Sequence, residues 1–347
     1  MTMNLSMDLQ VSIITPSFNR ADVIRETADS IFAQSYPNWE WMIVDDGSTD
    51  DSWEVLEEFA REDSRVRILK RDRGPKGACA CRNIGVAKSS GELLIFLDSD
   101  DVLAPFCLEQ RVNAINRVPD AGFVIVPMLL FKKSPYDLNL LWNIDKDTDE
   151  ISRLLTGDAI CQGTGTIWRR SHFERIGMWR EDLKLWQDVE LHLRAFFQHV
   201  PFVKRMDMRP DVFIRISDVS LSRTGYNSLP KIRSRCDVFC YTLEQMAEQN
   251  KLHQYRESVA YMGAHIILSA IRGGFYRDAT EMICMSVRYD LFPPLTLGNF
   301  RRYFSFRKRK MNKIPLLGRW LENRTRKQFP VAESTLGKVS LKKNDSV

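Results

Sequence analysis

The stretch Gly91-Glu92-Leu93-Leu94-Ile95-Phe96-Leu97-Asp98-Ser99-Asp100-Asp101 runs from a glycine through an unbroken apolar segment into three carboxylates within four residues. An apolar run of this length indicates a strand that is covered on both faces, as in parallel sheets. In open α/β sheets, ligands bind beyond the carboxyl ends of such strands. The three acidic side chains are therefore expected where a ligand binds.

Closely spaced carboxylates repel one another unless a cation lies between them. Mg²⁺ and Mn²⁺ prefer oxygen ligands and bridge readily to phosphates. The stretch therefore predicts a site for a divalent metal and a diphosphate. The alternative interpretation is a solvated acidic turn or a helix N-cap, in which Asp100 or Asp101 caps the segment that begins at Pro105.

The composition is that of an ordinary globular protein, with 347 residues of which 44% are hydrophobic and 27% charged. This length suits one large or two modest domains. Residues 1–10 have no secretion-signal pattern, and the densest apolar run, Phe123 to Phe131, is about half the length that spans a bilayer. Seven cysteines without metal-type spacing favour a reducing compartment. We therefore expect a cytoplasmic protein without a transmembrane helix.

The charge is divided unevenly along the chain. Residues 301–347 contain 14 Lys/Arg and three Asp/Glu, a net charge of +11, whereas residues 1–300 have a net charge of −6. This tail interleaves aromatic and basic residues, and four apolar side chains would share one face of a short helix: Leu316, Leu317, Trp320 and Leu321. We expect residues 300–347 to contact an anionic membrane surface, and we expect no nucleic acid. A solvated tail, or one packed on the acidic body, is the alternative.

The first hundred residues alternate between strand and helix patterns. The expected strands are Val11–Thr15, Trp41–Val44, Arg65–Leu69 and the apolar run before Asp98, and the expected helices are Val23–Phe32, the segment from Ser52, and Ala78–Lys88. Alternation of this kind predicts an α/β fold with a doubly wound, mostly parallel sheet and right-handed crossovers. The carboxyl ends of three strands then bring Thr15, Asp45 with Asp46, and Asp98 with Asp100 into one crevice. The alternative for each is a local cap or turn.

The later part of the chain contributes two further features. Gly163–Arg170 begins with small residues that would let a substrate approach the backbone. Asp188 lies in the first turn of a predicted helix, where it is either a functional carboxylate or a partner of the helix dipole. Tyr136–Glu150 is interpreted as an inserted or mobile loop. The expected organisation is a ligand-binding domain over residues 1–220, a helical appendage over 221–299 and the basic amphipathic tail over 300–347.

Five motifs in one order resemble those of the family-2 glycosyltransferases with the GT-A fold. They are Val11-Ser-Ile-Ile-Thr-Pro-Ser-Phe-Asn19, Ser30-Ile-Phe-Ala-Gln-Ser-Tyr-Pro37, Val44-Asp-Asp-Gly-Ser-Thr-Asp50, Cys81-Arg-Asn-Ile-Gly85 and Phe96-Leu-Asp-Ser-Asp-Asp101. The resemblance covers roughly residues 10–215. It implies that Thr15 and Asp46 contact the base of a nucleotide, that Asp45 supports them, and that Arg82 lies near the nucleotide.

The resemblance also implies roles for the later acidic residues. Asp98, Ser99 and Asp100 would form the family's DXD motif, with Asp98 toward the ribose and Asp100 on the metal, so that both aspartates bind Mg²⁺ or Mn²⁺. Asp188 aligns with the family's usual catalytic base. The glutamate that precedes this base in the family is replaced here by Gln187.

These roles match the chemistry of an inverting sugar transfer, which needs a base for the acceptor hydroxyl and a Lewis acid on the leaving phosphates. The sequence therefore predicts a metal-dependent, inverting glycosyltransferase that moves a sugar from a nucleotide-diphosphate donor, with a UDP-sugar favoured, to a hydroxyl of a glycan or lipid-linked acceptor. Such an enzyme would serve polysaccharide and cell-envelope biosynthesis, in the cytoplasm or peripherally on the cytoplasmic face of the membrane. The alternative is a catalytically inactive nucleotide-sugar-binding protein on the same fold, which the replacement at Gln187 permits.

Overall fold

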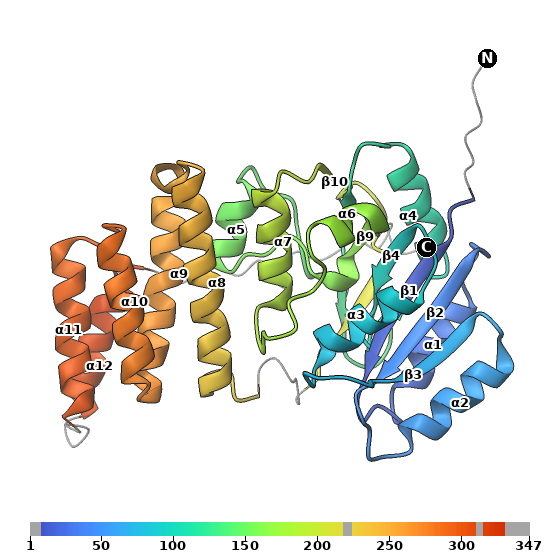
Figure 1. Cartoon of the computed structure of the whole chain (residues 1–347), viewed down its shortest axis with the longest axis horizontal. Helices are drawn as coiled ribbons and strands as arrows, with labels where there is room; N and C mark the ends of the chain where they lie inside the picture. Colours follow the sequence, from blue (N-terminus) through green and yellow to red (C-terminus); the bar gives the residue numbers. More distant parts are fainter. Residues whose placement is uncertain (1–7, 218–223, 310–314, 330–347) are drawn as a thin grey trace.

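The computed structural model describes residues 8–217, 224–309 and 315–329. Its central sheet contains β1 (Val11–Ser17), β2 (Trp39–Asp45), β3 (Val66–Lys70), β4 (Leu93–Phe96), β6 (Phe123–Ile125), β9 (Thr166–Arg169) and β10 (Phe202–Lys204). The order is β10-β6-β9-β4-β1-β2-β3, and only β9 runs antiparallel to its neighbours among these described strands. The predicted α/β fold with a mostly parallel sheet is confirmed (Figure 1).

Helices cover both faces of this sheet because its strands are apolar on both sides. Ile13 and Trp41 point to the face that is covered by α1 (Ile24–Phe32), α2 (Ser52–Glu62) and α4 (Cys107–Asn116). Ile14 and Met42 point to the opposite face, which is covered by α3 (Ala78–Lys88), α6 (Arg170–Arg175) and α7 (Gln187–Phe197). This two-sided burial is the physical reason why the strands read as continuous apolar runs.

A second, four-stranded sheet lies beside the first and includes one short strand from the segment predicted to be an inserted or mobile loop. Its strands are β5 (Val102–Leu103), β7 (Leu129–Phe131), β8 (Leu140–Leu141) and β11 (Val212–Arg215), in the order β5-β11-β7-β8. The segment Tyr136–Glu150, predicted to be an inserted or mobile loop, contains one short strand, because β8 pairs with β7, and the buried Asn143 anchors the chain just beyond it. Short strands of two or three residues gave too little alternation to be recognised.

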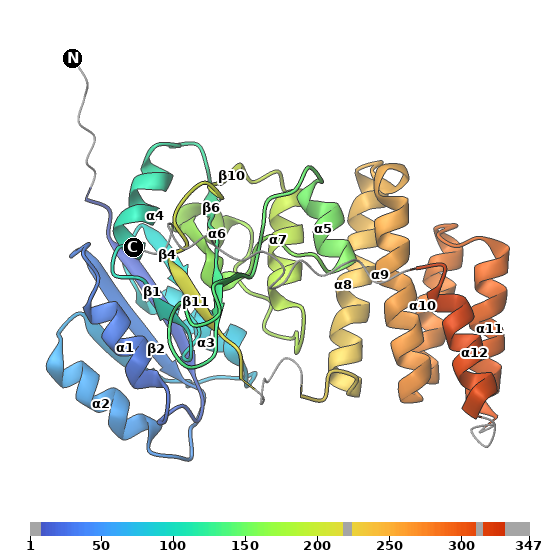
Figure 2. The same cartoon turned by 180° about the vertical axis from the view of Figure 1, so that it is seen from behind.

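The C-terminal third of the described chain is helical. It contains α8 (Leu229–Glu248), α9 (Leu252–Gly273), α10 (Tyr276–Arg288), α11 (Pro294–Lys308) and α12 (Pro315–Arg326), which extend away from the sheet beyond α7 and α5 (Glu150–Thr156) (Figure 2). Buried residues of these helices belong to the same apolar cluster as those beneath α3 and α7. Among the described helices, none is both long and apolar enough to cross a membrane.

The predicted boundary between appendage and tail at residue 300 falls inside α11. Phe300, Tyr303 and Phe306 are all buried, so α11 packs into the helical layer. In α12, Leu321 is partly buried against this core, whereas the side chains of Leu317 and Trp320 are exposed. The other predicted boundary, near residue 220, and the last eighteen residues of the predicted tail, 330–347, lie outside the described residues.

Candidate active site

A cleft of about 650 Å³ opens at the carboxyl ends of β1, β2 and β4. Its wall on one side comes from the loops that follow these strands, and its wall on the other side comes from residues 181–189, which lead into α7. Parallel strands that share one edge place their following loops together, which is why segments distant in sequence meet here. Six of the residues predicted to form the site line this cleft: Asp46, Arg82, Asp98, Ser99, Asp100 and Asp188.

Asp98 and Arg82 form the first ion pair of the cleft. Asp98 follows β4, Arg82 lies on α3, and Nη2 of the arginine is 2.6 Å from Oδ1 of the aspartate. The guanidinium is buried and lies 4.8 Å from the ring centroid of Trp179, while Asp98 stays 45% exposed to the cleft. A buried guanidinium beside a half-exposed carboxylate leaves the aspartate oxygens accessible to a ligand.

Two more carboxylates, Asp100 and Asp101, lie within three residues of Asp98 in the sequence. Burial and the charge of Asp98 raise the pKa of Asp100, against the lowering effect of Arg20, whose Nη2 lies 3.8 Å from the Asp100 Oδ2. Burial, Asp98 and Asp100 together raise the pKa of Asp101 well above its usual value. Nε of Arg215 donates to the main-chain oxygen of Asp100 at 2.8 Å. The raised pKa values mean that this corner would gain free energy from an added positive charge.

The donor set at this corner fits a hard divalent cation. Mg²⁺ is commonly held by one or two carboxylates, with the remaining positions filled by substrate phosphates and water. Within the described residues no group of three or more His, Cys, Asp or Glu side chains is arranged to hold a metal by itself. Asp98 and Asp100 would therefore hold a cation together with a diphosphate rather than as a closed protein site.

Asp46 and Asp45, at the end of β2, have different surroundings. Asp46 lines the cleft, pairs with Arg71 and accepts a hydrogen bond from the Gly77 N–H at 3.4 Å. Asp45 lies outside the lining, and its Oδ2 accepts hydrogen bonds at 2.9 Å from the N–H groups of Gly47 and Ser48. Asp45 therefore shapes the turn that presents Asp46, as an Asx turn does.

Thr15 is turned away from the cleft. It is fully buried on the face covered by α1 and α2, and its Oγ1 accepts a hydrogen bond from the Trp41 indole at 2.9 Å. Side chains alternate along a strand, so Thr15 shares its face with Ile13. The next residues of the chain, Pro16 and Ser17, line the cleft in its place.

Asp188 begins α7 and is joined to the glycine-rich segment that was predicted to approach a substrate. Its Oδ1 accepts a hydrogen bond of 2.6 Å from the N–H of Gly163, the first residue of the 3₁₀ turn η1 (Gly163–Gly165). A Cβ atom at Gly163 would lie 3.1 Å from that oxygen and 3.3 Å from the Trp179 ring. The absence of a side chain at residue 163 thus permits the close approach that orients the Asp188 carboxylate.

Gln187, the departure from the family pattern, makes a contact that an ionised glutamate could not make. Its Nε2 donates to the main-chain oxygen of Leu183 at 2.9 Å. A glutamate carboxylate has acceptors only and no proton for this carbonyl. The amide therefore stabilises the turn before Asp188 without adding a second charge.

The structure adds several residues that the sequence did not single out. Arg20, Lys76, Trp142, Lys184, Trp186 and Arg215 all line the cleft. Arg20 directly follows the first motif, so its position after a strand could have marked it as a site residue. Arg215 and Trp142 come from the second sheet, which the sequence pattern did not reveal.

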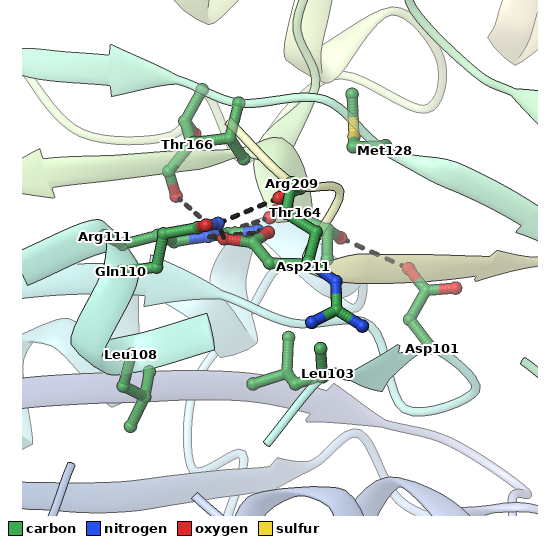
Figure 3. Close-up of polar contacts among 12 residues, drawn as sticks. Asp101, Leu103, Leu108, Gln110, Arg111, Met128, Thr164, Thr166, Arg209 and Asp211 are labelled. Carbon is green, nitrogen blue, oxygen red and sulfur yellow. Dashed lines mark hydrogen bonds and ion pairs between the residues drawn. The ribbon is translucent and has the colours of Figure 1, made fainter. Parts of the chain in front are cut away.

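A buried ion pair joins segments that lead to the cleft (Figure 3). Arg111 on α4 and Asp211, just before β11, are both fully buried, with Nη2 and Oδ1 2.6 Å apart. Nη1 of Arg111 also donates to the main-chain oxygen of Thr164 at 2.8 Å, and the Thr164 hydroxyl donates to Asp101 at 3.3 Å. This network connects η1, and with it the N–H that binds Asp188, to the acidic turn.

Known proteins share both the sequence and the fold. Residues 12–177 match the family model described as Glycosyl transferase family 2. An uncharacterized glycosyltransferase of Rickettsia prowazekii is 25% identical over 303 residues, which cover 80% of this chain and 91% of that protein. The UDP-Glc:alpha-D-GlcNAc-diphosphoundecaprenol beta-1,3-glucosyltransferase WfgD of Escherichia coli is 38% identical over 106 residues, which cover 30% of this chain and 41% of WfgD. The chain thus spans about two fifths of the length of that more identical relative.

The crystal structure of S. aureus TarS 1-349 in complex with UDP-GlcNAc matches with a TM-score of 0.63 at 16% sequence identity, over 92% of each chain. The mostly parallel sheet with helices on both of its faces is the fold of the GT-A glycosyltransferases. Residues 12–177, just under half of the chain, are thus similar to glycosyltransferase family 2.

Proposed function

We propose that this protein transfers a sugar, with inversion, from a nucleoside-diphosphate sugar to a hydroxyl of a glycan or lipid-linked acceptor, and that a UDP-sugar is the favoured donor. The observation that carries the proposal is a single cleft that contains Asp98 and Asp100 on one wall and Asp188 on the other. The names of two similar proteins support the donor class, since WfgD uses UDP-Glc and TarS was crystallised with UDP-GlcNAc.

In this proposal the acceptor hydroxyl oxygen attacks the anomeric carbon while the bond from that carbon to the diphosphate oxygen breaks. The electron pair leaves with the nucleoside diphosphate, and Asp188 takes the hydroxyl proton. The N–H of Gly163 holds one oxygen of Asp188, which leaves the other oxygen for this proton. Arg82 and Arg20 add positive charge beside the leaving diphosphate. A Mg²⁺ or Mn²⁺ ion at Asp98 and Asp100 would supply Lewis-acid stabilisation of the same group.

The donor site is tested by calorimetry with UDP in the presence and absence of Mn²⁺. Asp100→Asn should remove the part of UDP affinity that Mn²⁺ adds, because the amide is a poorer ligand and carries no charge. The matched control is Asp50→Asn. Asp50 is an exposed carboxylate in the loop after Asp46, and it lies outside the cleft lining. Equal UDP affinity with Mn²⁺ and with EDTA in the wild-type chain would contradict metal-dependent donor binding.

The base is tested by Asp188→Asn, which keeps the volume and an oxygen for the Gly163 N–H. Donor binding should stay nearly unchanged, while turnover should fall by at least the ~10²-fold that loss of a general base typically costs. This pair of measurements also separates the enzyme from the alternative, an inactive nucleotide-sugar-binding protein. Turnover at the wild-type rate on a confirmed acceptor would remove Asp188 from the mechanism.

The proposal includes a location at an anionic membrane surface, through α11 and α12. A groove between these helices is lined by Arg301, Arg302 and Arg309, and Leu317 and Trp320 are exposed nearby on α12. Each Lys or Arg close to an anionic bilayer contributes about 1 kcal/mol. We expect the chain to bind phosphatidylserine vesicles at low salt and to be released as the salt concentration rises.

Truncation at residue 299 would remove a packed helix, so charge reversal is the better test of this surface. The triple change Arg301→Glu, Arg302→Glu and Arg309→Glu should abolish flotation with anionic vesicles. A matched triple of exposed cations elsewhere, Arg61→Glu, Lys132→Glu and Lys133→Glu, should float like the wild type. Identical flotation of the two triples would refute the assignment of the membrane surface to α11 and α12.

A further inference from the structure

The end of the cleft beside Asp188 differs in chemistry from the end beside Asp98. The residues that line it are aromatic, amide or aliphatic: Trp142, Gln162, Leu185, Trp186, Gln187 and Val189. The part of the lining around Asp98 contains a dense set of charges, which includes Arg20, Asp98 and Asp100. One end therefore suits a charged diphosphate, and the other suits an uncharged group.

The two charged residues that border the neutral end are engaged elsewhere. Nζ of Lys184 donates to the main-chain oxygen of Lys76 at 2.7 Å. Glu181 accepts hydrogen bonds of 2.6 and 2.7 Å from the two terminal nitrogens of Arg73. Both side chains thus hold the loop of residues 73–77, which belongs to the charged end. Asp188 also lies at the neutral end, and its charge acts on the buried guanidinium of Arg82.

Trp186 occupies this end in an unusual backbone conformation. Its φ of 61° and ψ of 31° are left-handed, a conformation that strains a non-glycine residue. The neighbouring α8 supports it, since the Lys184 N–H donates to the Ser234 hydroxyl at 2.7 Å and the guanidinium of Arg235 lies 5.9 Å from the ring centroid of Trp186. A strained, bulky aromatic two residues before the proposed base indicates a function for the ring.

Trp142 enters the same cleft from the second sheet and is held by the backbone around it. Its N–H donates to the Met128 oxygen at 2.8 Å. The adjacent Asn143 is buried, accepts from the Met128 N–H at 2.9 Å, and donates to the oxygens of Val126 at 3.0 Å and Ile160 at 2.7 Å. The last contact joins Trp142 to the segment that leads to Gly163. Both tryptophans are thus fixed relative to Asp188.

We propose that Trp142 and Trp186 form a binding subsite for a neutral sugar ring, the residue of the acceptor whose hydroxyl reacts at Asp188. Aromatic rings offer a large, rigid apolar surface at little entropic cost, and the C–H face of a pyranose is apolar. The amides of Gln162 and Gln187 supply uncharged partners for its hydroxyls. An acceptor that presents a phosphate here would face the Asp188 carboxylate. This inference rests on the proposed function and adds the class of the acceptor.

The subsite is tested by binding rather than by turnover. Saturation-transfer NMR and calorimetry would be run with methyl glucoside, methyl galactoside and methyl N-acetylglucosaminide, and with glycerol phosphate as the anionic rival, each with and without UDP and Mn²⁺. At least one methyl glycoside should bind. Trp142→Ala and Trp186→Ala should each weaken it at least about tenfold, a loss of 1.4 kcal/mol. The control is Trp53→Ala, which should bind the glycoside like the wild type, because Trp53 lies on α2 outside the cleft lining.

A second variant separates loss of function from loss of folding. Trp186→Gly relieves the left-handed backbone, so its thermal midpoint should be at least that of Trp186→Ala, while glycoside binding should still be lost. Trp186→Phe keeps an aromatic face and should retain most of the affinity. Undecaprenyl-diphosphate-linked N-acetylglucosamine, compared with its methyl glycoside, shows whether the lipid adds affinity outside this subsite.

Two outcomes would overturn the proposal. One is glycoside binding that neither tryptophan variant changes, and the other is a chain that binds glycerol phosphate and none of the methyl glycosides. Failure of UDP to bind would instead count against the proposed function. The glycoside measurements without UDP would still decide the subsite in that case.

Discussion

Removal of Asp211 should destabilise the protein severely, because its partner Arg111 is fully buried. Asp211→Leu keeps the branching of the side chain but leaves the guanidinium without the carboxylate that accepts from Nε at 3.0 Å and from Nη2 at 2.6 Å. Breaking a buried pair from one side typically costs about 3–5 kcal/mol of unfolding free energy. At about 2 °C per kcal/mol for a chain of this size, the thermal midpoint should fall by about 6–10 °C.

The double variant Arg111→Met, Asp211→Leu gives the sharper comparison. Replacing both partners removes the unpaired charge, but it also removes the Nη1 donor from the Thr164 oxygen, and an unsatisfied buried carbonyl costs about 1–3 kcal/mol. The double variant should therefore be more stable than Asp211→Leu alone, although less stable than the wild type. Thermal unfolding followed by circular dichroism, with all variants at one pH and salt concentration, measures the difference.

The reasoning fails if Asp211→Leu costs less than about 1 kcal/mol, the range of exposed pairs. It also fails if the double variant is less stable than either single variant, because the two losses would then add instead of compensating. A functional readout accompanies the stability data. Since Thr164 follows Gly163, the double variant should lose turnover while its UDP affinity stays close to that of the wild type.

Two further predictions concern the site and the pH response. Gly163→Ala should lower turnover by about 10²-fold with little change in UDP affinity, because its Cβ would lie 3.1 Å from the Asp188 oxygen and displace that carboxylate; wild-type kinetics would contradict this. Burial acts to raise the pKa of Glu40, but hydrogen bonds from the N–H groups and hydroxyls around it lower the pKa below its usual 4.5. The stability that this carboxylate contributes is therefore present above about pH 4.5. It is lost as the pH falls through the lower pKa of the folded state. Thermal midpoints between pH 3 and 7 should therefore show a smaller acid-induced loss in Glu40→Gln than in the wild type, whereas the exposed Glu54→Gln should follow the wild-type curve.

Several parts of the site followed from local sequence. The apolar run before Asp98 predicted a buried strand with acids at its carboxyl end, and strand and acids lie where expected. The predicted helix Ala78–Lys88 has the bounds of α3, which carries Arg82 to Asp98. Asp188 was predicted in a first helical turn, and α7 begins one residue before it. These features depend on contiguous residues and on the rule that parallel strands share an edge, so a linear pattern contains them.

Other features depend on contacts that the tertiary structure alone decides. Thr15 was predicted to end a strand, but β1 continues to Ser17. The Thr15 hydroxyl accepts from Trp41 on the face away from the cleft, because the alternation of the strand sets the direction of a side chain. Arg111 and Asp211 are 100 residues apart, and no local period signals that two charges so distant will be buried together. The neutral end of the cleft combines Trp142 from the second sheet with Trp186 before α7. Sequence alone thus determined which functional side chains follow each strand or begin each helix along the chain. Packing between residues far apart in the sequence decided which side chains meet around Asp188.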